Sequence, residues 1–64
     1  MEPTKLQILY WQSQMLHDKL FSLEHIIRKI SAQGKTPQKA LAKYLDTIDE
    51  LRETSAEMIL HEEA

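Results

Sequence analysis

The stretch Gln33-Gly34-Lys35-Thr36-Pro37 divides the chain into two segments of similar length. Gly34 is the only glycine, and it is well placed to adopt the left-handed backbone conformation that ends a helix. Thr36 then fits an N-cap, and Pro37 fits the first helical position, where its missing N–H removes no hydrogen bond. These residues predict that one helix ends and a second begins across a tight turn.

A matching start signal stands near the beginning of the chain. Thr4-Lys5-Leu6-Gln7 fits a capping box, in which the Gln7 side chain reaches back to the backbone N–H of the capping Thr4. The sequence therefore predicts helices over about residues 4–33 and 36–62. The expected fold class is all-α, an antiparallel two-helix hairpin that forms a single domain over residues 1–64.

The composition excludes several other classes of protein. The 64 residues include one glycine, two prolines and no cysteine. An all-β fold needs many turn residues, and a disulfide framework, a reactive thiol or a cysteine-based metal site needs cysteine. The apolar runs are too short to span a membrane, and Met1-Glu2-Pro3-Thr4 does not resemble the start of a secretory signal. We therefore expect a cytoplasmic protein that does not bind membranes.

Apolar residues recur with the heptad spacing of helices that pack side by side. In the first predicted helix, seven of the eight a and d positions are apolar, and Ser13 is the exception. The a positions are Leu6, Ser13, Leu20 and Ile27, and the d positions are Leu9, Leu16, Leu23 and Ile30. In the second, the a positions are Leu41, Ile48 and Ser55, the d positions are Tyr44, Leu51 and Met58, and Leu45 and Ile59 lie beside them at e.

Each predicted helix carries one serine in its apolar pattern, and the two serines fall at matching places. An antiparallel hairpin folded about Gly34 pairs Ser13 with Ser55. The same register pairs Ile27 with Leu41, and Leu20 with Ile48. This match favours a hairpin over one long bent helix, and it predicts a small polar layer where the serines meet.

A second apolar surface is expected on the outer side of the first helix. Trp11 lies opposite the heptad face, where a helix that only covered a hairpin would carry polar residues. The predicted partner-binding residues are Ile8, Trp11, Met15 and Phe21. Two helices alone leave each apolar face half open. We therefore expect completion as a four-helix bundle, either by a second copy in a homodimer or by a helical partner protein.

Charged residues are segregated along the chain, although the net charge is only −2. Five basic residues around the turn have no acidic residue between them: Arg28, Lys29, Lys35, Lys39 and Lys43. Acidic residues follow, against the single Arg52: Asp46, Asp49, Glu50, Glu53, Glu57, Glu62 and Glu63. Two explanations stay open. The basic turn of one copy could lie beside the acidic end of another copy and fix their orientation, or it could contact nucleic-acid phosphates or an acidic partner.

The residues that catalysis would require are sparse. The histidines are His17, His25 and His61, and the spacing of Glu57 and His61 arises often by chance on a polar helix. A single glycine cannot build a phosphate-binding loop, and Ser13 has no base beyond His17, which points off the heptad face. We expect no catalytic residue, no metal site, no cofactor and no small-molecule substrate, so the protein is not expected to be an enzyme.

These observations lead to two hypotheses of function. The first is a non-enzymatic regulatory, adaptor or chaperone protein that binds a helical partner protein through an apolar helical face. The alternative is a Rop-like homodimeric hairpin regulator that binds nucleic acid through the basic turn. In shape alone, the expected architecture resembles the Rop regulators of plasmid copy number, which bind paired RNA loops. It also resembles the small acidic hairpin chaperones of type III secretion needle subunits. A purely structural piece of a larger assembly is a third interpretation.

Overall fold

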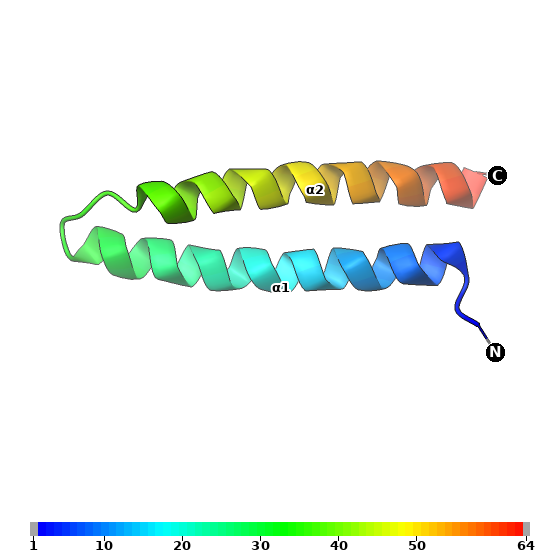
Figure 1. The fold of residues 1–64 in the computed structure, drawn as a ribbon, viewed down its shortest axis with the longest axis horizontal. Coiled ribbons are helices and arrows are strands. Elements are labelled where there is room, and N and C mark those ends of the chain that lie inside the picture. Colours follow the sequence, from blue (N-terminus) through cyan, green and yellow to red (C-terminus); the bar gives the residue numbers. More distant parts are fainter. Residues whose placement is uncertain (1, 64) are drawn as a thin grey trace.

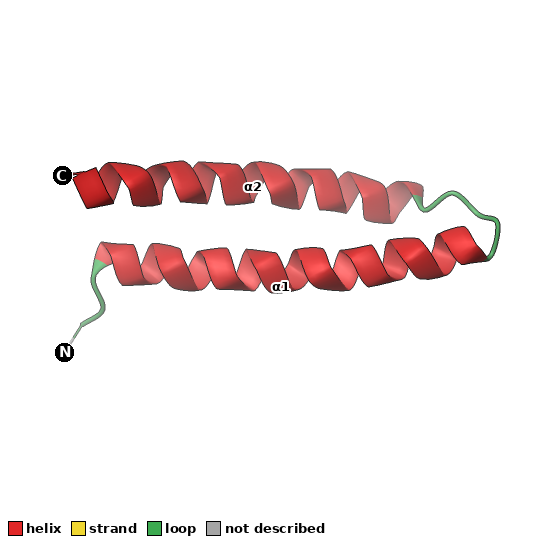
Figure 2. Ribbon diagram, turned by 180° about the vertical axis from the view of Figure 1, so that it is seen from behind, coloured by secondary structure: helices red, strands yellow, loops and turns green. Residues whose placement is uncertain are grey.

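Two antiparallel helices lie side by side and form the whole fold of residues 2–63, the part of the chain that the computed structural model describes (Figure 1). Helix α1 spans Lys5–Ala32 and helix α2 spans Gln38–Glu63. The hairpin measures 48 × 21 × 13 Å, and both chain ends lie at the end opposite the turn. Seen from behind, the described residues contain only helix and loop (Figure 2). The all-α antiparallel hairpin is therefore confirmed, and neither described helix has the length and apolar character to cross a membrane.

The start of α1 carries the predicted capping box. The Thr4 hydroxyl oxygen accepts a hydrogen bond from the Gln7 backbone N–H at 3.2 Å. In return, the Thr4 backbone N–H donates to the Gln7 side-chain oxygen at 3.0 Å. Two N–H groups that the first helical turn leaves free are satisfied in this way.

The turn satisfies the last carbonyl groups of α1. Gly34 has a φ of 78°, and its N–H donates to the Ser31 carbonyl at 3.0 Å. The Lys35 N–H donates to the Ile30 carbonyl at 3.4 Å, which completes a Schellman motif. A Cβ on Gly34 would meet nothing within 4 Å, so the positive φ alone makes glycine the favoured residue there.

Helix α2 begins one residue later than the sequence predicts. The Thr36 carbonyl accepts from the Gln38 N–H at 2.9 Å, which forms a tight turn ahead of the helix. The first helical hydrogen bond runs from the Leu41 N–H to the Pro37 carbonyl at 2.9 Å. Pro37, which is buried, therefore occupies the capping position that the sequence assigns to Thr36.

The inward face of α1 matches the predicted heptad. Every a and d position is buried or half-buried, and every other residue of α1 is exposed. Leu9 and Leu23 are the most enclosed, at 3% and 7% exposure. All the leucines of α1, together with Ile27 and Ile30, are thus directed at α2.

The inward face of α2 is rotated relative to the prediction. The interhelical residues of α2 are Ala40, Tyr44, Thr47, Leu51, Thr54 and Met58, with Ile48 half-buried at the edge. Leu41 and Ser55 are exposed, so the predicted pairing of Ser13 with Ser55 is wrong. The antiparallel order of inward residues instead places Thr54 opposite the half-buried Ser13.

Three of the six inward residues of α2 are small: Ala40, Thr47 and Thr54. Thr47 is only 1% exposed, and its hydroxyl donates to the Lys43 carbonyl at 2.7 Å. The Thr54 hydroxyl donates to the Glu50 carbonyl at 2.9 Å. Because each hydroxyl is satisfied within its own helix, threonine can face α1 without an unpaired polar group. These small residues alternate along the inward face with the larger Tyr44, Leu51 and Met58, so small and large side chains of α2 both meet the leucines and isoleucines of α1.

Candidate protein-interaction surfaces

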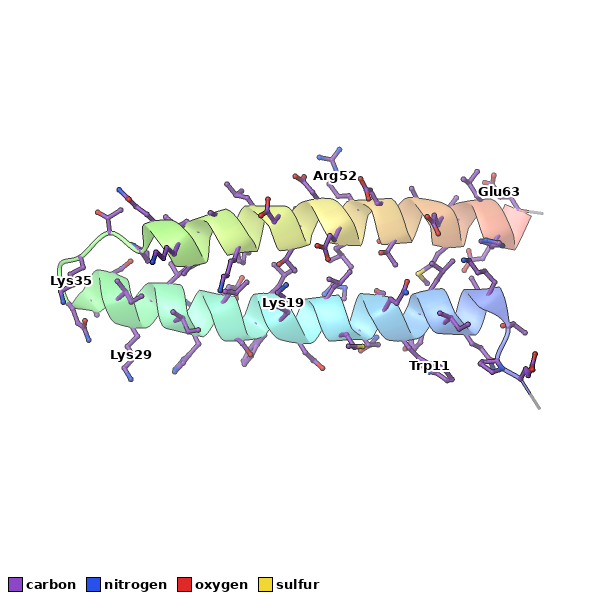
Figure 3. The ribbon with its side chains drawn as sticks, viewed as in Figure 1. Trp11, Lys19, Lys29, Lys35, Arg52 and Glu63 are labelled. Atoms are coloured by element: carbon purple, nitrogen blue, oxygen red, sulfur yellow. The ribbon has the colours of Figure 1, made fainter. Side chains whose placement is uncertain are left out.

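The outer side of α1 carries the first exposed apolar surface, which we name the tryptophan face. Its members are Ile8, Trp11, Met15 and Ile26, which fall on one side of the helix by their spacing. The Trp11 side chain is 54% exposed and points away from α2 (Figure 3). Met15 is 71% exposed. Three of the four predicted contact residues therefore share one face.

The second exposed apolar surface lies on α2, and we name it the aliphatic stripe. Its members are Leu41, Leu45, Ile48 and Ile59. Their spacing places them about 100° around α2 from the interhelical interface. Leu45 is 62% exposed and Ile59 is 55% exposed. The larger β-branched and leucine side chains of α2 therefore gather on a face that α1 does not cover.

A groove between the helices joins the tryptophan face to acidic residues of α2. It has a volume of about 330 Å³ and is lined by Gln12, Met15, Leu16, Glu50, Glu53 and Thr54. Met15 thus borders an apolar hollow whose opposite wall carries two carboxylates. An apolar side chain with a positive charge beside it would fit this edge of the hairpin, because the apolar side chain would enter the hollow and the charge would lie near the carboxylates.

The opposite edge of the hairpin carries the aliphatic stripe. On this edge the Tyr44 hydroxyl donates a hydrogen bond to the Glu24 carboxylate at 3.0 Å. That hydrogen bond, together with partial burial and the nearby negative charge, raises the pKa of Tyr44 above its ordinary value of 10.0. Phe21 is 76% exposed and lies on the same side of α1 as Glu24.

Phe21 is consequently separated from the other three predicted contact residues. Helical geometry places it about 140° around α1 from Ile8. A single partner helix on the tryptophan face would leave Phe21 uncovered. The sequence contains the signal for this division, because the helical repeat alone fixes the angle between residues 8 and 21.

The predicted basic residues gather at the turn end of the hairpin. All five are exposed: Arg28, Lys29, Lys35, Lys39 and Lys43. Figure 3 shows Lys29 and Lys35 at this end and Glu63 at the other. The hairpin is therefore positive at the turn and negative along the open end of α2.

Metal-ligating side chains do not cluster in the described part of the chain. Across residues 2–63, no three histidine or carboxylate side chains gather closely enough to hold a metal ion. The three histidines lie exposed at separate positions: His17, His25 and His61. Within the same residues, every buried side-chain nitrogen and oxygen has a hydrogen-bond partner.

Comparison with protein-family models, with curated proteins and with solved structures finds no match to this chain.

Proposed function

We propose that this chain is a non-enzymatic adaptor or chaperone that binds a helix of a partner protein through the tryptophan face. The observation that carries this proposal is the position of Trp11, which projects from α1 on the side away from α2 (Figure 3). Ile8 and Met15 flank it within one helical turn on either side. Tryptophan that becomes fully enclosed on binding is among the residues that contribute most to interface affinity.

The groove beside Met15 indicates the chemistry of the partner helix. An amphipathic helix presents apolar side chains three and four residues apart, which matches the spacing of the tryptophan face. Glu50 and Glu53 line the far wall of the groove. A partner helix with lysine or arginine beside its apolar anchors would place those charges near the two carboxylates.

Nucleic-acid binding is the second candidate, and the gathered basic residues at the turn favour it. Such binding releases condensed counterions, so its affinity falls steeply as salt rises. The discriminating measurement is the affinity for an RNA hairpin at several salt concentrations. A steep dependence that disappears in the variant Lys39→Gln/Lys43→Gln would support this candidate, and an absence of binding at low salt would contradict it.

The proposed function is tested by comparing substitutions of two exposed aromatic residues of α1, which helical spacing places about 80° apart around the helix. The partner is first identified by mass spectrometry of the complex purified from the source cells. Trp11→Ala is expected to weaken partner binding by a factor of about 30 or more, as for a central interface residue. Phe21→Ala is the matched control, and it should leave the affinity within about threefold, as a residue outside the contact does.

Circular dichroism separates loss of contact from loss of fold. Trp11 is exposed, so Trp11→Ala should keep the helicity of the parent chain. Unchanged partner binding by Trp11→Ala would contradict the proposal. A larger loss in Phe21→Ala than in Trp11→Ala would move the contact to the other edge of the hairpin.

A further inference from the structure

We propose that a second copy of this chain docks in antiparallel orientation on the aliphatic stripe, and that the two copies form a two-fold symmetric four-helix assembly. This proposal does not depend on the tryptophan face, which stays open for a partner protein. The symmetric contact is α2 against α2 of the second copy. Four observations support it: the exposed area, the arrangement of the stripe, the place of Arg52 and the distribution of charge.

The hairpin exposes more surface than a protein of its mass can usually leave uncovered. Its accessible surface is 5420 Å² for a mass of 7.5 kDa. A compact monomer of this mass exposes about 4,200 Å². The difference exceeds the roughly 800 Å² that each partner buries in a standard protein interface. A contact of standard size along α2 would cover a large part of this excess.

The aliphatic stripe is complementary to itself when two copies run antiparallel. Leu41 and Ile59 lie at equal distances along the helix from residue 50. A two-fold axis near residue 50 therefore places Leu41 of each copy against Ile59 of the other. The same axis places the large Leu45 opposite the small Ser55, so that large and small side chains alternate across the contact.

Arg52 has a defined place in this arrangement. It interrupts the stripe between Ile48 and Ser55, and its side chain projects away from α1 (Figure 3). The two-fold axis places it beside Ile48 of the second copy, where its aliphatic stem can cover that side chain. Its guanidinium then lies near the acidic Asp49 of the second copy, close to the axis.

Charge selects the antiparallel orientation. The first turns of α2 carry Lys39 and Lys43, and its last turns carry Glu57 and Glu62. Antiparallel docking brings the basic end of each hairpin to the acidic end of the other, whereas parallel docking would place like ends together. Lys39, Lys43 and Glu57 lie about 160° around α2 from the aliphatic stripe, so this preference acts between the ends of the two hairpins and not across the contact itself. The helix dipoles also oppose each other favourably in the antiparallel pair.

The first test is the mass in solution, with two leucines of α2 as a matched pair. Leu45 and Leu60 are 62% and 67% exposed, and Leu60 lies off the aliphatic stripe. Sedimentation equilibrium of the purified chain should give twice 7.5 kDa. Leu45→Glu should raise the dimer dissociation constant about a hundredfold, while Leu60→Glu should leave it within about threefold. A monomeric parent chain, or equal effects of the two substitutions, would overturn the proposal.

A crosslinking test keeps the proposal decidable even if Leu45→Glu fails to fold. The parent chain has no cysteine, so single cysteines report one contact each. A mixture of Leu41→Cys and Ile59→Cys chains should form the mixed disulfide under mild oxidation, and Leu41→Cys alone should not link to itself. Self-linking of Leu41→Cys would show parallel docking and overturn the antiparallel orientation.

Failure of this proposal and failure of the proposed function give different results. Trp11→Ala should leave the dimer mass unchanged because Trp11 lies on the opposite side of the hairpin from the aliphatic stripe. If Trp11→Ala instead converts the dimer to a monomer, the second copy occupies the tryptophan face, and docking on the stripe is refuted.

Discussion

Helix α1 and helix α2 have similar lengths, yet their inward faces differ in side-chain size. α1 presents leucine or isoleucine to its neighbour at every inward position except Ser13, and its two most enclosed residues are Leu9 and Leu23. α2 presents alanine or threonine at three of its six inward positions and keeps Leu41 and Leu45 on the aliphatic stripe. The difference teaches that a broad apolar surface does not by itself choose the buried face. Size complementarity with the opposing helix makes that choice.

The largest expected difference in stability is between alanine substitutions of one leucine in each helix. Leu9→Ala should lower the free energy of unfolding by about 2–4 kcal/mol, because Leu9 is enclosed between the helices. Leu45→Ala should cost less than about 1 kcal/mol in dilute solution, where the stripe is open to water. Urea unfolding followed by circular dichroism measures both.

Changing the protein concentration should separate the effects of Leu9→Ala and Leu45→Ala on stability further. If a second copy covers the aliphatic stripe, the cost of Leu45→Ala should grow with protein concentration more than that of Leu9→Ala. Equal costs for the two substitutions in dilute solution would refute the contrast between the helices.

Enlarging a small interhelical residue of α2 should also destabilise the hairpin. Thr47→Leu adds apolar volume, but the site is 1% exposed and close to α1. Overpacking of this kind should lower the free energy of unfolding by about 1–3 kcal/mol. Thr47→Val, which has nearly the same shape, is the control and should cost less. A more stable Thr47→Leu protein would show that the interface has room for a large residue and that size does not set the rotation of α2.

The smallest expected effect concerns the titration of Tyr44, which lies on α2 and is hydrogen-bonded to Glu24 of α1. The Glu24 hydrogen bond favours the neutral Tyr44 phenol, so the pKa of Tyr44 lies above 10.0 in the folded state. As pH rises past 10, the unfolded chain loses this proton first, and the hairpin should lose stability. Ultraviolet titration in a Tyr10→Phe background follows Tyr44 alone. Glu24→Ala should lower its pKa, and an unchanged pKa would mean that the hydrogen bond is absent in solution.

The sequence predicts the hairpin because local signals stand where helices begin and end. The Thr4 capping box and the Gly34 turn form as expected, and the heptad of α1 matches its buried face residue by residue. Such features depend on the chain's own spacing and backbone preferences, so they can be found without knowing the fold. The start of α2 differs by one residue because the turn at Thr36 is tighter than a simple cap.

The sequence does not predict the rotation of α2, because two apolar faces lie side by side on that helix. Hydrophobicity ranks Leu41 above Thr47, and it therefore favours the wrong residue for the interior. The preference for threonine depends on its bond to the Lys43 carbonyl and on the size of the opposing leucines, both of which are features of the assembled pair.

The short turn at Gly34 also has a consequence for the order in which the hairpin forms. Residues 33–37 connect the helices, so contacts near the turn close small loops, while contacts at the open end must close nearly the whole chain. Loop-closure entropy rises with length, and the helices should therefore join first at the turn and zip toward the termini. In the folded state the same gradient makes the termini the first part to open, so amide hydrogens there should exchange with solvent soonest.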